Sequence, residues 1–232
     1  LGGTFDPVHA GHVAIARAAA DSLGLASVRF MPAGSPWQKD EVTPAVRRLA
    51  MLELAVKCDP RFGIDRTELL REGPTYTIET LAQLREGMGG SIPLVLIMGG
   101  DQWANLHTWV RWRELVEYAD LAVASRSGAP IRSTPDVERW AERRIAPAES
   151  LTDAPSGRIA FFSMPAHRAS SSLIRRTLAL EPLPRAMQLL EGWMTADVAE
   201  YIVSEEIYGL FQHQAPFIHE HRRTHPHRRP GS

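Results

Sequence analysis

Residues 2–12 read Gly2-Gly3-Thr4-Phe5-Asp6-Pro7-Val8-His9-Ala10-Gly11-His12 and run directly into the amphipathic stretch Val13–Arg17. The residues Leu1-Gly2-Gly3 are typical of the end of a strand whose first residues lie upstream. Glycine lets the backbone adopt positive φ and approach a ligand closely. A helix that begins near Gly11 offers free N–H groups and the positive end of its dipole to a phosphate. The stretch therefore predicts an anion site at a strand-to-helix turn.

Two histidines in this stretch are the candidate anion ligands. His9 and His12 are three residues apart, so both imidazoles can face one anion, and Gly11 between them leaves that space open. Two alternatives remain. A lone histidine near a turn usually has a structural role, and a pair of histidines can bind a metal. Asp6 is the one nearby third ligand, so we favour the anion site.

Short apolar runs alternate with helical patterns along the chain. Strands are expected at about 28–31, 93–98, 121–124 and 159–162, and helices at about 12–23, 44–57, 77–86, 105–118, 171–180 and 195–204. This alternation is typical of βαβ units. It predicts an α/β fold with a Rossmann-like, doubly wound, mostly parallel sheet that carries helices on both faces. In such sheets, ligands bind beyond the carboxyl ends of the strands.

Several candidate binding residues follow expected strands or open expected helices. Asp101 comes after the apolar run 93–98, where a carboxylate can accept hydrogen bonds from ribose hydroxyls. The turn Tyr76-Thr77 opens a helix and can present N–H donors to a carboxylate. Trp109 and Trp112 lie three apart on an expected helix, and each could either stack on a ligand or pack in the core. We favour stacking for Trp109 and core packing for Trp112.

Composition limits the remaining possibilities. The chain has 232 residues, 44% of them apolar and 23% charged, with a net charge of −1, so nothing in it indicates a nucleic-acid or membrane partner. The single cysteine, Cys58, is expected to be buried and fits a reducing cytoplasm. Residues 127–156 read as an insertion with one helix near 136–144 and Trp140 packed inward. Residues 213–232 hold five of the nine histidines and four arginines, and we expect a disordered tail after a domain that spans residues 1–212.

The stretch GGTFDPVHAGH resembles the GG(T/S)FDPxHxGH signature of the bacterial nicotinate-mononucleotide adenylyltransferase family. Its HxGH part is shared with pantetheine-phosphate adenylyltransferases, cytidylyltransferases and class I aminoacyl-tRNA synthetases. Residues 169–175, ASSSLIR, are similar to the family's ISSTxIR motif, and residues 75–81, TYTIETL, to its (S/T)YTxxTL motif. The loop Pro36-Trp37-Gln38-Lys39 departs from the family's PxxxPxHK-like pattern but keeps Lys39. The resemblance spans about residues 2–211 and ends with an expected helix, 198–211, that carries Tyr201 and Tyr208.

The resemblance implies adenylyl transfer from ATP to nicotinate mononucleotide, in a cytoplasmic enzyme of pyridine-nucleotide biosynthesis. It assigns catalysis to His9, His12, Lys39 and Arg175. It assigns ATP binding to Gly2, Gly3, Thr4, Phe5, His12, Gly100, Asp101, Ser170, Ser171 and Arg175. It assigns nicotinate-mononucleotide binding to Lys39, Tyr76, Thr77, Trp109 and Arg126. Mg²⁺ would be held mainly by ATP phosphates, with no dedicated protein ligands.

Three questions stay open on the sequence alone. Either Arg47 or Arg48 is expected to face the site, and the other to be exposed. A capping serine with a solvated arginine is the alternative for Ser170 and Arg175. A pantetheine-phosphate acceptor, or a nucleotide-binding regulator with a basic tail, is the alternative function, and the intact His9, His12, Ser171 and Arg175 argue against the regulator.

Overall fold

The computed structural model describes residues 1–34, 42–125 and 130–210. Lys39 with its Trp37-Gln38 neighbours, Arg126 and the 213–232 segment lie outside these ranges, so the predictions made for them stay predictions. Within the described ranges, no helix is long and apolar enough to cross a membrane.

The strands form two parallel ladders. β1 (Gly2–Gly3), β2 (Val28–Pro32) and β3 (Phe62–Ile64) pair in that order, as do β4 (Val95–Gly99), β5 (Asp120–Ser125) and β6 (Ile159–Ser163). The predicted parallel α/β architecture is confirmed. It differs from the expectation in one respect, because β1 lies beside β4 without a ladder between them. β1 has only two residues, and the carbonyls of Leu1 and Gly3 already accept hydrogen bonds from Met31 in β2 and from Ala33 just after it.

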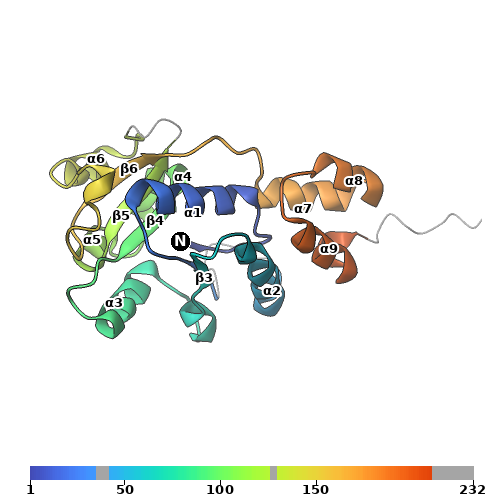
Figure 1. Ribbon diagram of the computed structural model, residues 1–232, viewed down its shortest axis with the longest axis horizontal. Helices are drawn as coiled ribbons and strands as arrows, with labels where there is room; N and C mark the ends of the chain where they lie inside the picture. The colour runs from blue at the N-terminus through green and yellow to red at the C-terminus, as the bar shows by residue number, and fades with distance from the viewer. Residues whose placement is uncertain (35–41, 126–129, 211–232) are drawn as a thin grey trace, which may run out of the picture.

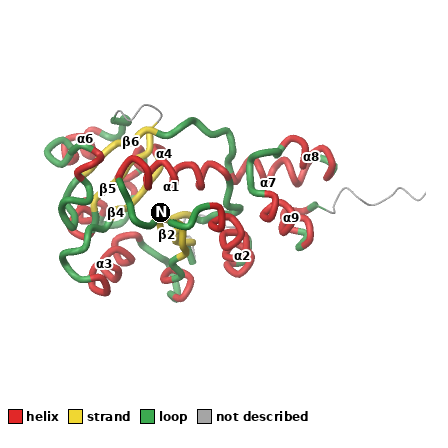
Figure 2. The backbone as a smooth tube through the Cα atoms, viewed as in Figure 1, coloured by secondary structure: helices red, strands yellow, loops and turns green. Residues whose placement is uncertain are grey.

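Helices cover the ladders and extend beyond them. They are α1 (Ala10–Leu23), α2 (Ala45–Ala55), α3 (Thr77–Met88), α4 (Gly100–Ala104), α5 (Leu115–Tyr118), α6 (Pro135–Ala141), α7 (Ser171–Leu180), α8 (Leu183–Leu189) and α9 (Ala196–Ser204). Figure 1 shows α7, α8 and α9 grouped at one end of the molecule, with the strands β4–β6 and α5 and α6 at the other end. The tube in Figure 2 shows α1 running between these two ends.

Both faces of the β4–β5 pair are buried, as the continuous apolar run predicted. Ile97 and Ala122 belong to the core cluster that includes the inner face of α1, whereas Leu96, Met98 and Leu121 belong to a second cluster with α3 and α5. Alternate residues of a strand point to opposite faces, so a strand that is apolar at every position needs a helix layer on each side. Burial of each such side chain contributes about 1.5–3 kcal/mol.

The 105–118 segment is not the continuous helix that was expected. Trp109 has φ −79° and ψ 143°, and Arg111 has φ 52°, so the chain is extended and then left-handed between two short 3₁₀ turns. Trp109 and Trp112 therefore do not share a helical face. Trp112 is buried and packs edge-on against Trp140 with ring centroids 5.0 Å apart, which confirms the core position of the first and the inward packing of the second.

Other boundaries also differ from expectation. The expected 198–211 helix ends at Ser204, and Tyr208 lies in a 3₁₀ turn, Ile207–Gly209, with φ 69°. The predicted burial of Cys58 is wrong: its side chain is exposed at the end of a 3₁₀ turn that follows α2. That turn winds more tightly than an α-helix, so it takes Cys58 off the buried face of α2.

Candidate functional site

The loop after β1 is held in an unusual backbone conformation. Phe5 has φ 51°, and its side chain is buried between His12, at a ring-centroid distance of 5.0 Å, and Phe30, at 5.8 Å. A Cβ at Gly3 would lie 3.1 Å from the Phe5 ring, so glycine there lets the ring fold back under the strand. Phe5, a predicted ATP-binding residue, thus has its side chain in the core, where its packing supports the conformation of the loop.

The two histidines lie together at the start of α1. His9 precedes the helix in an extended conformation, and its ring stacks on His12 at 3.7 Å with an interplanar angle of 26°. Nδ1 of His12 accepts a hydrogen bond from the backbone N–H of His9 at 3.2 Å. A neutral His12 therefore carries its proton on Nε2, where it can donate. A Cβ at Gly11 would come within 3.1 Å of the His9 ring, which accounts for glycine between the pair.

The electrostatics of His9 fit a neutral imidazole. Burial lowers the pKa of His9 to about 4, and the nearby His167 adds to the shift. Nδ1 of His9 is buried, and no residue of the described ranges is its hydrogen-bond partner. His9 is thus uncharged at neutral pH, and its Nδ1 lies buried beside Gly11.

The N-terminus of α7 is tied to this loop. Ser170 caps the helix by accepting a hydrogen bond from the N–H of Leu173 at 3.2 Å, which is the capping role considered as its alternative. The Ser171 hydroxyl donates to the carbonyl of Pro7 at 2.9 Å. The Arg175 guanidinium donates to the carbonyl of Asp6 at 2.5 Å, so it is not a solvated surface charge. The histidine motif and the serine–arginine motif are therefore brought side by side.

A buried arginine joins the loops that follow β1 and β2. Arg48 is 1% exposed and donates to the carbonyl of Thr4 at 2.8 Å, to those of Ala33 and Gly34 at 2.8 and 3.2 Å, and to that of Thr43 at 2.9 Å. Burial lowers its pKa, and the charge of Asp6 opposes that shift. Every carbonyl in this set belongs to a loop at the carboxyl edge of the first ladder, so Arg48 fixes the shape of that edge.

The question left open for Arg47 and Arg48 is thereby answered. Arg48 faces the site loops without lining the cavity, and Arg47 is half-buried rather than exposed and donates to the carbonyl of Glu205 at 3.1 Å. The two residues are adjacent in sequence, and α2 turns them about 100° apart. The amphipathic pattern alone could not distinguish them, because a buried arginine breaks that pattern.

A cavity of about 1470 Å³ lies between the two ladders. It exceeds the roughly 300–1,000 Å³ of common small-molecule sites. Its lining includes seven of the predicted binding residues, namely Gly2, Gly3, Thr4, Tyr76, Thr77, Asp101 and Trp109. His9 instead lines a smaller hollow of about 360 Å³ together with His167, Met194 and Thr195. Ser171 and Arg175 contact the loop that precedes His9.

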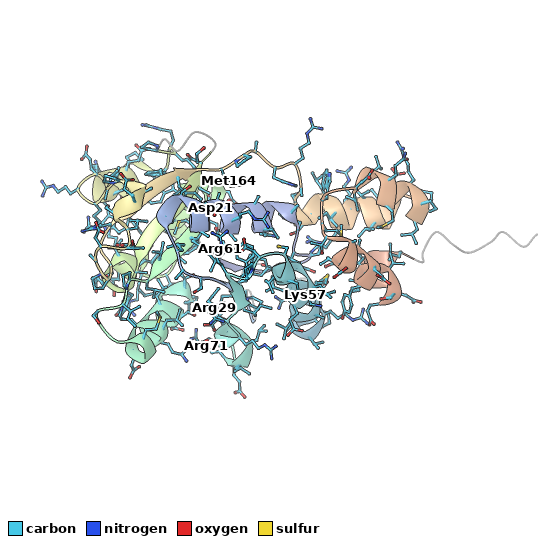
Figure 3. All side chains as sticks on the ribbon, in the orientation of Figure 1. Asp21, Arg29, Lys57, Arg61, Arg71 and Met164 are labelled. Atoms are coloured by element: carbon cyan, nitrogen blue, oxygen red, sulfur yellow. The ribbon has the colours of Figure 1, made fainter. Side chains whose placement is uncertain are left out.

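The start of α3 is built as a donor site. Tyr76 precedes the helix with an extended backbone, and Thr77 is its first residue. The N–H groups of Glu79 and Thr80 donate to the carbonyl of Tyr76, whereas those of Thr77 and Ile78 have no acceptor within the helix. Sequence reasoning missed the support behind this turn: Thr80 donates to Glu68 at 2.9 Å, and Arg71, which is labelled in Figure 3, donates to Thr80 at 3.0 Å. Burial raises the pKa of Glu68, and the hydrogen bond from Thr80 opposes the shift.

Asp101 lies at the carboxyl end of β4, where the sequence placed it. It is exposed and lines the cavity from the first turn of α4. A Cβ at Gly99 would lie 2.7 Å from Oδ1 of Asp101, so glycine is needed for the carboxylate to take this position. Gln102 accepts a hydrogen bond from the N–H of Gly99 at 2.9 Å and fixes the turn.

Comparisons with known proteins identify the family. The cytidylyltransferase-like family model matches residues 1–177. The "Probable nicotinate-nucleotide adenylyltransferase" of Dechloromonas aromatica is 38% identical over 214 residues, which cover 90% of this chain and 95% of that protein. The protein of the same name from Neisseria meningitidis serogroup C is 43% identical over 181 residues, covering 77% of this chain and 85% of that protein.

Solved structures share the fold. The nicotinic acid mononucleotide adenylyltransferase of Plasmodium falciparum complexed with NaAD superposes with a TM-score of 0.67 at 15% identity, covering 90% of this chain and 95% of that chain. The family model covers more than half of this chain. The bacterial relatives share more than a third of their aligned residues with this chain over most of its length. The chain belongs to the nicotinate-nucleotide adenylyltransferase family of cytidylyltransferase-like nucleotidyltransferases.

Proposed function

We propose that the chain transfers the adenylyl group of ATP to nicotinate mononucleotide, giving deamido-NAD and pyrophosphate, at the carboxyl edge of its two ladders. The observation that carries the proposal is the cavity that Thr4, the Tyr76-Thr77 turn and Trp109 line together. The bacterial relatives named for this activity match this chain over most of its length.

The reaction exchanges one phosphorus–oxygen bond for another. A phosphate oxygen of the mononucleotide bonds to the α-phosphorus of ATP, and the bond from that phosphorus to the oxygen bridging the β-phosphate breaks, so pyrophosphate leaves with the electron pair. The second pKa of a phosphate monoester is about 6, so the nucleophile is already an anion at neutral pH. No general base is required, and catalysis consists of positioning and charge neutralisation.

We assign the charge-stabilising roles to His9, His12, Lys39 and Arg175. A neutral His12 with its proton on Nε2 supplies a donor to a phosphate oxygen, and His9 stacks on the His12 ring and holds it in place. Arg175 lies against the loop that leads into the histidine pair. Lys39, which lies between β2 and α2 in the sequence, would neutralise the negative charge that develops on the phosphate oxygens. Gly2, Gly3, Thr4, Gly100, Asp101, Ser170 and Ser171 would complete the ATP site.

The donor set supports a metal ion that enters on the nucleotide. The described ranges contain no group of three His, Cys, Asp or Glu side chains that could hold an ion, and the Asp6 carboxylate faces Tyr208 and Thr43 rather than the histidine pair. We propose that Mg²⁺ is held by phosphate oxygens and water, where it neutralises triphosphate charge.

The acceptor site should prefer an acid to an amide. N–H donors at the start of α3 favour the acceptor-only carboxylate of nicotinate, whereas an amide would turn its NH₂ toward some of them. An unpaired buried donor costs about 1–3 kcal/mol, so one or two of them give a preference of about 10- to 10⁴-fold. The test is kcat/KM for nicotinate and nicotinamide mononucleotides at the same ATP concentration. Equal values would show that the Tyr76-Thr77 turn does not hold the carboxylate.

Replacement of Trp109 by alanine should weaken both mononucleotides alike. The ring is partly buried and lines the cavity, and stacking on a pyridine ring does not distinguish an acid from an amide. We expect KM to rise about tenfold for each acceptor, with their ratio unchanged, because an aromatic stack contributes about 0.5–1.5 kcal/mol beyond the contact area lost with it. Steady-state kinetics with both acceptors checks this. A change in the ratio would place Trp109 against the carboxyl group.

A further inference from the structure

The Asp6 carboxylate has two partners from distant parts of the chain. It is 4% exposed, and its Oδ1 accepts a hydrogen bond from the Tyr208 hydroxyl at 2.7 Å. Its Oδ2 accepts from the backbone N–H of Thr43 at 3.2 Å. A buried carboxylate requires such partners, and the proposed reaction gives Asp6 itself no chemical step. Tyr208 therefore connects the C-terminal end of the described chain to the loop that leads into the histidine pair.

The packing of the C-terminal segment places the Tyr208 hydroxyl beside Asp6. Tyr208 has φ 69°, which is uncommon for a bulky residue, between Ile207 and Leu210, which are both buried. The turn contacts α7 and α9, which lie at the same end of the molecule (Figure 1). Burial, and to a smaller extent the hydrogen bond to Asp6, raises the pKa of Tyr208. The phenol therefore stays protonated at neutral pH and donates to Asp6.

The loop that contains Asp6 is the one that binds phosphate in the proposed function. The carbonyl of Asp6 accepts from Arg175, and the next carbonyl, that of Pro7, accepts from Ser171. If the Asp6 carboxylate lost its hydrogen bonds, it could move and displace Ser171 and Arg175. Its negative charge would also repel the triphosphate. Among the described residues, Arg48 interacts electrostatically with Asp6, and Arg175 donates to the Asp6 backbone carbonyl. The Tyr208 hydroxyl donates directly to the carboxylate and is also hydrogen-bonded to the Thr43 side chain.

We propose that Tyr208 is a positioning residue for ATP, which acts by holding the Asp6 carboxylate so that the loop Thr4–Val8 and the start of α7 form one anion site. The inference rests on the proposed function, since it names a further determinant of that site. The hydrogen bonds to the Asp6 carboxylate involve no residue of the acceptor site at Tyr76 and Trp109, so the proposal predicts a larger effect on ATP than on the mononucleotide.

The test is Tyr208→Phe in the full chain, with Tyr201→Phe as the matched control. Tyr201 is also a partly buried tyrosine of the C-terminal helices, but its hydroxyl is not bonded to the loop. We expect Tyr208→Phe to raise the dissociation constant for ATP, measured by calorimetry, about five- to tenfold and to lower kcat about tenfold, as loss of one hydrogen bond to a charged group does. The KM for nicotinate mononucleotide should stay within about twofold, and Tyr201→Phe should change none of these values.

A double-mutant cycle with Asp6→Asn decides whether Tyr208 acts through Asp6. In the Asp6→Asn background, Tyr208→Phe should cause no further loss of ATP affinity or kcat, because the charged acceptor is already gone. Additive losses, equal effects of the two tyrosine variants, or a Tyr208→Phe protein that unfolds below the assay temperature would overturn the proposal. A wild-type chain that binds ATP but forms no deamido-NAD would instead refute the proposed function, and the calorimetric comparison would still decide the role of Tyr208.

Discussion

Replacement of His12 by alanine is expected to lower kcat by about 100-fold or more, with little change in KM for either substrate. The expectation follows from removal of one preorganised donor to transition-state charge, which commonly costs about 10²–10³ in kcat. Nδ1 of His12 is committed to the backbone N–H of His9, so Nε2 is the atom that can meet a phosphate oxygen. A group that acts mainly on the transition state changes kcat rather than substrate binding.

Steady-state kinetics with both substrates varied provides the measurement, and His107→Ala is the matched control. His107 is exposed in the 3₁₀ turn Leu106–Thr108, whereas His12 stacks on His9 at the start of α1. Its loss should leave kcat unchanged. A His12→Ala protein with normal kcat and raised KM for ATP would reassign His12 to ground-state binding.

Replacement of Arg48 by methionine is expected to cause the largest loss of stability. The substitution leaves the carbonyls of Thr4, Ala33, Gly34 and Thr43 without their shared donor and removes the positive charge beside Asp6. Removal of one member of a buried charged group costs about 3–5 kcal/mol. For a chain of this size, that loss corresponds to a decrease in Tm of roughly 10 °C.

The adjacent Arg47→Met is the control for this experiment. Arg47 makes one exposed hydrogen bond, so its loss should change stability by no more than about 0.5 kcal/mol. Denaturant unfolding followed by circular dichroism compares the two variants. Equal destabilisation would mean that the Arg48 hydrogen bonds contribute no more to stability than a surface contact.

The sequence predicted the local parts of this molecule well, because local physics determines them. α7 was predicted with its exact bounds, since Ile174 and Leu178 repeat at helical spacing behind a capping serine. The turn at Gly99-Gly100 was placed correctly after a strand that both core clusters bury. Such elements depend on neighbours within a few residues of each other.

Interactions between distant segments could not be predicted in the same way. The bond from Tyr208 to Asp6 spans 202 positions, and the hydrogen bonds of Arg48 depend on two loops meeting beside α2. The helical pattern predicted a helix that ends at residue 204, as α9 does, whereas the family resemblance placed Tyr208 on a helix that runs to residue 211. Tyr208 instead lies in a 3₁₀ turn between the buried Ile207 and Leu210. Trp109 was placed on a helix because an extended residue between two 3₁₀ turns leaves no periodic signal.

The most direct test of the central claim follows the α-phosphate of ATP. ATP labelled at the α-phosphorus is incubated with the full chain, Mg²⁺ and either nicotinate mononucleotide or pantetheine phosphate, and the products are separated by chromatography. We expect the label in deamido-NAD, with one unlabelled pyrophosphate released for each dinucleotide formed, and a far slower reaction with pantetheine phosphate. Label that stays in ATP with nicotinate mononucleotide, or that passes preferentially to pantetheine phosphate, would contradict the account.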